Sequence, residues 1–143
     1  MELIAVVVSA VFAGLYTGFQ ATVTVLVYPQ FARVPPGAFR SYHAAHQRLI
    51  TVVVGPLFAG LLLGAALMVV VPGPVTPGWS RIAVPILVGV ILGLTGFGAV
   101  PCHRTLSAGF DATVLHRLRA IDGLRLVAAL GLLVVGVLTL DQR

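Results

Sequence analysis

Four long runs without a charged residue dominate this sequence. They cover residues 3–32, 49–80, 82–102 and 126–140. A helix needs about 20 apolar residues to cross a bilayer. The first three runs are long enough to cross a bilayer. The fourth is long enough when residues 121–125 are added to it. The sequence therefore predicts four transmembrane helices, near residues 3–26, 49–71, 82–101 and 122–140.

The composition places the chain in a membrane. Of its 143 residues, 59% are hydrophobic and only 9% are charged, and the mean hydropathy is +1.07. These values lie far outside the usage of soluble proteins. The chain begins Met-Glu-Leu, without the positive segment of a signal peptide, so we expect the first helix to be retained. We predict an all-α integral membrane protein, a four-transmembrane-helix bundle that forms one domain over residues 1–143.

The arginines gather in two of the three predicted loops. Those between helices 1 and 2 and between helices 3 and 4 are Arg33, Arg40, Arg48, Arg104, Arg117, Arg119 and Arg125. Arg-rich loops stay in the cytoplasm. We therefore expect an inner (plasma) membrane protein with both termini outside and with its Arg- and His-rich loops cytoplasmic. The same bias accounts for the net charge of +5, so no nucleic-acid partner is expected beside the lipid bilayer.

The two halves of the chain share a weak pattern. Pro29 is followed eight residues later by Gly37, and Pro101 is followed eight residues later by Gly109. The pattern fits either chance or a duplication. A duplication would give two pseudo-repeated helical hairpins related by an axis along the membrane normal.

Three pairs of glycines lie four residues apart within the predicted helices. They are Gly14 and Gly18, Gly60 and Gly64, and Gly89 and Gly93. Such pairs let helix backbones approach closely in lipid. We expect them to serve packing within the bundle, and a homo-oligomer formed through these glycine-rich faces is the alternative.

All four histidines fall on the predicted cytoplasmic side. His43 and His46 precede the second helix, His103 follows the third and His116 precedes the fourth. Histidine is costly in a membrane unless it has a partner or a function. The histidines therefore form either a shared functional site or a set of polar residues tolerated at the interface.

The spacing of two histidines suits a shared ligand. His43 and His46 are one helical turn apart on a stripe that runs from Phe39 to Ile50. This spacing can direct both imidazoles to one metal ion or one substrate. Imidazole ligands without thiolates favour copper, zinc or iron, and haem is a further option. A site without metal stays open, and the candidate metal ligands are His43, His46, His103 and His116.

Other polar residues near the helices have simpler predicted roles. Asp111 is expected to cap the fourth helix. Asp122 lies three residues before Arg125 and is expected to pair with it. The few acids make a carboxylate-rich di-iron site improbable. Gln20 lies well inside the first helix, where its amide needs a partner on another helix or on a ligand.

Short motifs at the ends of the first and third predicted helices resemble a known family. They are Tyr28-Pro29-x-Phe31 and Val100-Pro101-x-His103-x-x-Leu106, with Pro35 and residues 39–46 between them. This layout is similar to that of the small four-helix membrane proteins of the anthrone oxygenase-like group. His103 stands where many members carry asparagine. Members with an assigned role oxidise aromatic anthrones with molecular oxygen.

The resemblance implies a membrane-embedded oxidoreductase or oxygenase that acts on a hydrophobic aromatic substrate. It maps His43, His46 and His103 onto the polar positions of the family, where a histidine base would remove an acidic proton from the substrate. The candidates to bind the substrate and its anion are Tyr28, Tyr42, Gln20 and Arg104. A bound copper, iron or haem could instead activate the oxygen, and the sequence leaves both routes open.

A small oligomeric transporter, channel or metal-handling membrane protein is the alternative function. Its histidines would then form a gate or a metal relay, and four short helices would need to oligomerise to enclose a pore. The first, third and fourth predicted helices carry no acidic residue near mid-membrane. This argues against coupled transport.

Overall fold

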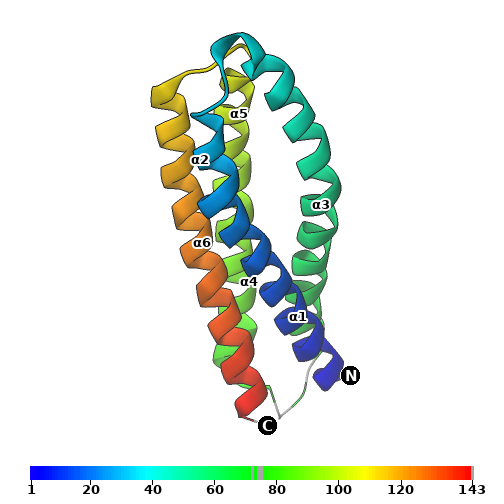
Figure 1. Ribbon diagram of the computed structural model, residues 1–143. Coiled ribbons are helices and arrows are strands. Elements are labelled where there is room, and N and C mark those ends of the chain that lie inside the picture. Colours follow the sequence, from blue (N-terminus) through cyan, green and yellow to red (C-terminus); the bar gives the residue numbers. More distant parts are fainter. Residues whose placement is uncertain (72, 74–75, 143) are drawn as a thin grey trace.

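Four long helices run alternately up and down in the computed structural model (Figure 1), which describes residues 1–71, 73 and 76–142. The first long helix is a continuous rod made of three segments. They are α1 (Glu2–Thr22), the π-helical segment η1 (Val23–Val27) and α2 (Tyr28–Phe31). The second rod is α3 (Pro36–Val70). The third joins α4 (Gly78–Gly93), the π-helical segment η2 (Leu94–Ala99) and α5 (Val100–Leu106), and the fourth is α6 (Ala112–Asp141).

Each rod is long and apolar enough to cross a membrane. The described residues contain no strand. The backbone N–H and C=O groups of a helix bond to each other, and hydrocarbon offers them no other partner. The predicted all-α bundle with four membrane-spanning helices is therefore confirmed.

The helices extend further toward the Arg-rich end than the predicted spans. The second rod begins at Pro36, ahead of the predicted span but in agreement with the helical stripe expected from Phe39 to Ile50. The fourth begins at Ala112 rather than near residue 122. The side chain of Asp111 accepts hydrogen bonds from the backbone N–H groups of Thr113 and Val114, at 2.8 and 3.0 Å. The predicted helix cap is thus confirmed. A helix of 30 residues is about 45 Å long, which exceeds the hydrocarbon thickness of about 30 Å.

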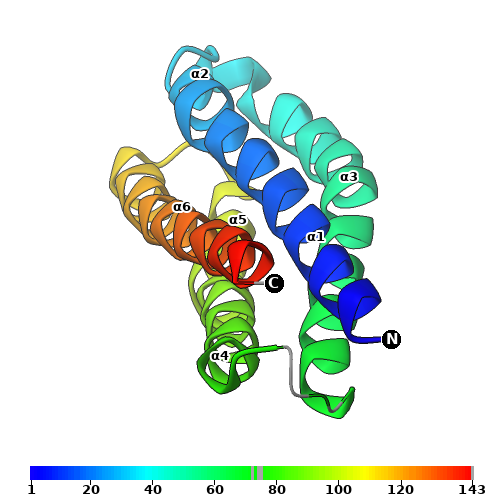
Figure 2. The same ribbon diagram turned by 90° about the horizontal axis from the view of Figure 1, so that it is seen from below.

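The four rods form a square (Figure 2). The α1 helix packs against α3 and α6, and α4 packs against the same two helices. Thus α1 and α4 lie diagonally across the bundle, as do α3 and α6. This is the arrangement expected of two helical hairpins related by an axis along the bundle.

The two hairpins share a second feature. In each, a π-helical segment ends two residues before a proline, at Pro29 and at Pro101. Proline has no backbone N–H to donate, and its ring disturbs the preceding helical turn. A π-helical turn absorbs this disturbance and widens the helix, and such turns are frequent at functional sites. Both wide segments lie in the Arg-rich half of the bundle.

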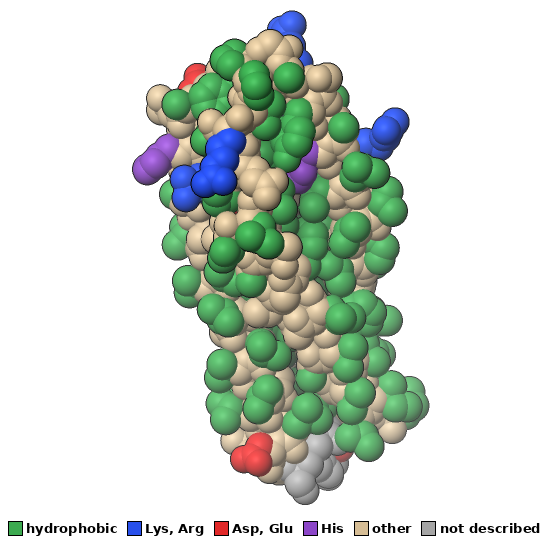
Figure 3. Space-filling view, viewed as in Figure 1, with side chains coloured by type: hydrophobic (Ala, Val, Ile, Leu, Met, Phe, Trp, Pro, Cys, Tyr) green, Lys and Arg blue, Asp and Glu red, His purple; other side chains and the backbone are tan. Residues whose placement is uncertain are grey.

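The polar and apolar surfaces are separated along the bundle. Exposed hydrophobic side chains cover its middle, and arginine side chains gather at the end away from the termini (Figure 3). Both termini lie together at the opposite end (Figure 1). The α3 helix ends and the α4 helix begins at that same end. Residues 72, 74, 75 and 143 lie outside the described residues.

The glycine pairs differ in what they contact. A Cβ atom added to Gly64 would lie 2.9 Å from the Cα atom of Ser9, and one added to Gly60 would overlap the ring of Phe12. This pair therefore brings α3 close to α1. At Gly93 an added Cβ would meet no heavy atom within 4 Å among the described residues.

Gly64→Ala is expected to destabilise the bundle by about 1–3 kcal/mol, because the new methyl group presses on the backbone of α1. Gly93→Ala is the matched control, and it is expected to be neutral or slightly stabilising because alanine favours a helix. Thermal unfolding of both variants in detergent measures the difference. Equal stability of the two variants would show that Gly64 is not a packing position.

Candidate functional site

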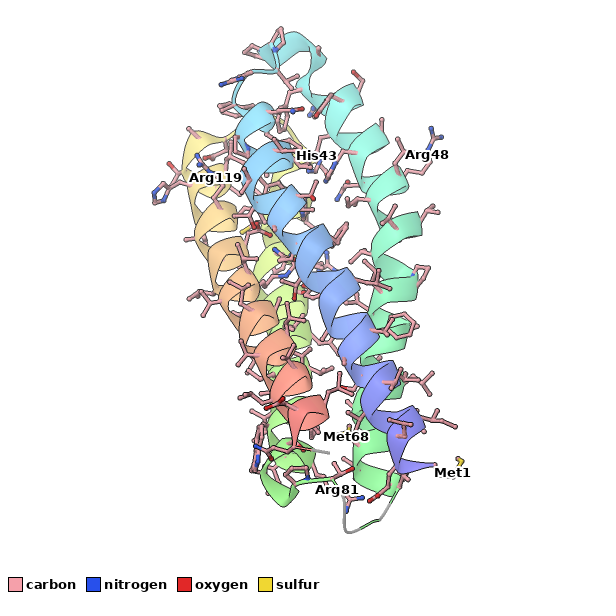
Figure 4. All side chains as sticks on the ribbon, turned by 60° about the horizontal axis from the view of Figure 1, so that its bottom comes forward. Met1, His43, Arg48, Met68, Arg81 and Arg119 are labelled. Carbon is pink, nitrogen blue, oxygen red and sulfur yellow. The ribbon has the colours of Figure 1, made fainter. Side chains whose placement is uncertain are left out.

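Three of the four histidines come together inside the Arg-rich end of the bundle. There α3 stands apart from α2 and α5 (Figure 1), and side chains fill the space between them. His43 lies within this layer, between the helices (Figure 4). The ring centroids of His43 and His103 are 5.3 Å apart, and those of His46 and His103 are 6.1 Å apart. The predicted histidine cluster is thus brought together from α3 and α5.

Aromatic rings hold these imidazoles in place. Phe39 stacks on His43 with centroids 5.6 Å apart, and Phe31 meets His46 edge to face at 4.9 Å. Both phenylalanines are fully buried. The helical stripe from Phe39 through His43 and His46 therefore faces inward as predicted. Fixed rings limit the orientations of the histidines, which favours defined hydrogen bonds between them.

The polar atoms of this layer form one chain of hydrogen bonds. The Tyr28 hydroxyl lies 3.2 Å from Nε2 of His103, and Nδ1 of His103 lies 3.1 Å from Nε2 of His43. Nδ1 of His43 lies 3.5 Å from Oγ of Ser107, the longest step of the chain. Tyr28 and His43 are buried, whereas Ser107 is exposed. The chain therefore leads from the interior to the surface.

Neutral imidazoles allow the chain to be protonated in two ways. Each neutral ring carries one N–H and one bare nitrogen. In one arrangement every N–H and O–H of the chain points toward Ser107, and in the other every one points toward Tyr28. A proton that enters at one end can thus release another at the far end, which converts one arrangement into the other. The geometry is that of a proton relay.

A cavity of about 450 Å³ lies beside this chain. Its walls come from all four rods, and most of its lining is apolar, as is typical of sites for small hydrophobic molecules. Tyr28 and His103 form part of the wall. Thr51 on α3 and Val100 and Arg104 on α5 also line the cavity and are exposed. The cavity therefore opens sideways between α3 and α5, toward the surrounding lipid.

The cavity follows from the two wide helical segments. Val23 in η1 and Thr95 and Ala99 in η2 contribute to its lining. Gly55 on α3 leaves further room. The prolines that follow η1 and η2 thus shape the same space that the histidines border.

A second polar cluster lies deeper, where α1 meets α6. Nε2 of Gln20 donates to Oδ1 of Asp122 at 2.5 Å, and the hydroxyl of Thr24 donates to Oδ2 at 2.5 Å. Nη1 of Arg125 lies 3.6 Å from Oδ1 of the same carboxylate. Nη2 of Arg125 donates to the hydroxyl of Tyr16 at 3.0 Å. The predicted pairing of Asp122 with Arg125 is confirmed, and the amide of Gln20 has its partner on another helix.

This cluster corrects the prediction for Asp122. It was expected at the very start of the fourth helix, but it lies ten residues inside α6 and is fully buried. A buried acid is therefore present in the fourth helix, which removes one argument against coupled transport. Sequence reasoning also missed Arg125 as a residue of the cavity wall. The available signal was the stripe of polar residues four apart in the first helix, at positions 16, 20 and 24.

The histidines do not fit a metal centre as they are arranged. Nε2 of His43 and Nδ1 of His103 are hydrogen-bonded to each other, so they do not point at a common ion. Within residues 1–71, 73 and 76–142, no three His, Cys, Asp or Glu side chains are placed to hold a metal. His116 is exposed and lines a separate hollow with Thr24 and Arg119. It therefore does not join the other three histidines.

The predicted substrate-binding residues lie in three places. Tyr28 and Arg104 line the cavity. Tyr42 lines a different hollow along α3, together with half-buried His46. Gln20 belongs to the deeper cluster. Arg48 is exposed and points away from the bundle (Figure 4), and exposed Arg40 donates a hydrogen bond to the carbonyl of Ala108 at 2.6 Å.

Together these features define a four-helix membrane protein with a laterally open cavity and a histidine relay. Comparison of the chain with protein-family models, with curated proteins and with solved structures finds no match. The resemblance to the anthrone oxygenase-like group therefore stays a prediction.

Proposed function

We propose that this protein is a membrane-embedded oxidoreductase that acts on a hydrophobic aromatic substrate with molecular oxygen. The observation that carries the proposal is the chain Tyr28–His103–His43, which borders an apolar cavity open toward lipid. A substrate of this kind dissolves in the bilayer and can enter between α3 and α5. It would bind with its acidic group against Tyr28 and His103.

The first proposed step is removal of a proton from the substrate. The Tyr28 oxygen accepts this proton and passes its own to Nε2 of His103. Nδ1 of His103 then gives its proton to His43, and His43 gives its proton to Ser107 at the surface. The substrate is left as a carbanion or phenolate, without a charged histidine in the apolar layer.

The second proposed step transfers electrons to oxygen. For an anthrone-like substrate, the ring methylene becomes a carbonyl. One atom of O₂ enters the product. The other leaves as water with the remaining methylene hydrogen and one proton that returns through Ser107, which replaces the proton released in the first step and restores the first arrangement of the relay. The four electrons that reduce O₂ come from the oxidised carbon. Because the histidine nitrogens do not converge on an ion, no step of this sequence passes through a metal.

The proposed orientation follows the arginines. The Arg-rich end, with the histidine relay, faces the cytoplasm of a plasma (inner) membrane, and both termini face outward. Protons released at Ser107 would then enter the cytoplasm. Cysteine labelling of single residues placed at each end tests this orientation.

His43→Ala with His46→Ala is expected to lower turnover about 10²-fold, because the relay loses its middle member. His43→Ala alone should account for most of this loss, since His46 meets the ring of Phe31 edge to face and holds no position in the chain of hydrogen bonds. Oxygen consumption with an anthrone substrate measures the effect on protein purified in detergent. Size-exclusion chromatography checks that the variants remain assembled.

Metal analysis and an absorption spectrum of the same samples complete the test. The expected wild-type protein is colourless and turns over without bound metal. Stoichiometric copper, iron or haem that disappears in the double variant would contradict the metal-free relay. Absence of oxygen consumption with anthrones and related phenols would contradict the proposed activity.

Coupled transport is the second candidate function, and one observation favours it. Asp122 and Arg125 are a buried ion pair inside a membrane-spanning helix, and such residues often mark ion or proton pathways. Proton uptake by vesicles that contain the purified protein measures this activity. Uptake that is lost in Asp122→Asn, without oxygen consumption, would favour transport over oxidation.

A further inference from the structure

Arg125 lines the cavity and carries a donor without a partner. The residue is 5% exposed and shares the cavity wall with Tyr28 and His103. Within the described part of the chain, its Nε atom is buried and finds no hydrogen-bond acceptor. A buried N–H without an acceptor is destabilising, and more so in a charged group. Arg125 therefore combines an incompletely paired guanidinium with a place in the cavity wall.

The neighbours of Arg125 fix the position of its guanidinium but leave part of its hydrogen-bonding capacity unused. Its Nη2 donates to the Tyr16 hydroxyl, and Asp122 lies 3.6 Å from Nη1. The carboxylate oxygens of Asp122 already receive short hydrogen bonds from Gln20 and Thr24. Asp122 thus balances the positive charge of a guanidinium that lies in the cavity wall. This is the preorganised donor that stabilises a developing negative charge best.

We infer that Arg125 binds the oxyanion of an aromatic ligand in this cavity, a phenolate or an enolate. The ligand's O–H bond breaks as its proton passes to the Tyr28 oxygen. The Tyr28 proton moves to Nε2 of His103, and the proton on Nδ1 of His103 leaves through His43 toward Ser107. The guanidinium of Arg125 donates a hydrogen bond to the negative oxygen. The apolar wall, which includes Phe19 and Phe58, takes the aromatic rings. The inference rests on the proposed function for its ligand class, but it concerns binding and ionisation and not oxidation.

The sequence pointed instead to Arg104 for this task. Arg104 also lines the cavity but is exposed, so water and lipid headgroups weaken its field. Arg125 acts in a drier environment, where a charge-assisted hydrogen bond is stronger. The structure therefore assigns the oxyanion to the deeper arginine.

The test uses 2-naphthol as the probe, with protein in lipid nanodiscs and no turnover required. Naphtholate absorbs at longer wavelength than neutral naphthol. At a pH where naphthol in empty nanodiscs is neutral, the wild-type protein is expected to show a saturable naphtholate band. 2-Methylnaphthalene, which has a methyl group in place of the hydroxyl, is expected to compete at least tenfold more weakly.

Two variants separate binding from folding. Arg125→Lys keeps the positive charge beside Asp122 but loses the planar guanidinium, and its naphtholate band is expected to fall at least tenfold. Arg125→Met with Asp122→Asn removes both charges together and should abolish the band in a folded protein. Arg48→Gln, at an exposed arginine that points away from the bundle, is the control and is expected to keep the band. Arg104→Gln tests the competing arginine and is expected to reduce the band less than Arg125→Lys does.

Several results would overturn the inference. It fails when wild type binds naphthol only in the neutral form, or when folded Arg125→Lys shows an undiminished band. It also fails when Arg104→Gln, and not the Arg125 variants, removes the band. A naphtholate band in a protein that does not consume oxygen would support the inference while the proposed oxidation fails, so the two outcomes are distinguishable.

Discussion

Replacement of His103 by glutamine is expected to lower kcat about 10²–10⁴-fold while the protein remains folded. His103 joins Tyr28 to His43, with its two ring nitrogens 3.2 and 3.1 Å from their partners. Glutamine can still make a hydrogen bond in this layer. It cannot accept a proton at one atom and release another from the opposite side, as an imidazole does. The relay is therefore interrupted at its central position.

Oxygen consumption and product formation measure this loss, and Arg48→Gln provides a control. Arg48 is exposed and points away from the bundle (Figure 4), so its replacement should leave kcat unchanged. Full activity in a folded His103→Gln protein would exclude the relay. A variant that loses activity only because it fails to assemble would show itself by size-exclusion chromatography.

Replacement of Asp122 by leucine is expected to destabilise the protein by about 3–5 kcal/mol. The substitution leaves Arg125 buried without its balancing charge and removes the hydrogen-bond acceptor of Gln20 and Thr24. Breaking a buried ion pair costs more than the pair itself contributes, because the remaining charge stays in an apolar medium. Unfolding by denaturant in mixed micelles measures the change in free energy.

Two further variants identify the cause. Leucine at both Asp122 and Arg125 removes both charges and is expected to recover a large part of the lost stability. Asp122→Asn keeps an oxygen acceptor and loses only the charge, so its stability should fall between wild type and Asp122→Leu. A double variant less stable than Asp122→Leu would show that the isolated positive charge is not the cause.

Part of the candidate site was predictable from helical periodicity. The stripe through Phe39, His43 and His46 places these side chains on one face wherever the helix lies, and the cap at Asp111 depends only on its own neighbours. His103 was expected nearby because both segments lie at the same end of the bundle. These features are set by local geometry and by the requirement that long apolar runs cross the bilayer.

The deeper cluster was not predictable in the same way. The uncharged run of the fourth helix begins after Arg125, so a search for apolar residues places Asp122 and Arg125 at its edge. The helix in fact extends ten residues before Asp122. It can do so because Gln20 and Thr24 of the first rod satisfy the carboxylate and Tyr16 accepts from the guanidinium. Only packing between α1 and α6 supplies those partners.

The sequence by itself determined that this protein is a bundle of four membrane-spanning helices with its histidines and most of its arginines at one end. In hydrocarbon, a long apolar segment must form a helix to satisfy its backbone hydrogen bonds. The composition of the chain therefore decides the helical bundle. The tertiary structure alone decided which polar atoms meet: Tyr28 with His103, His103 with His43, and Arg125 with an open cavity. Those contacts depend on distances of a few ångströms between helices far apart in sequence, which the pattern of residues along one helix does not specify.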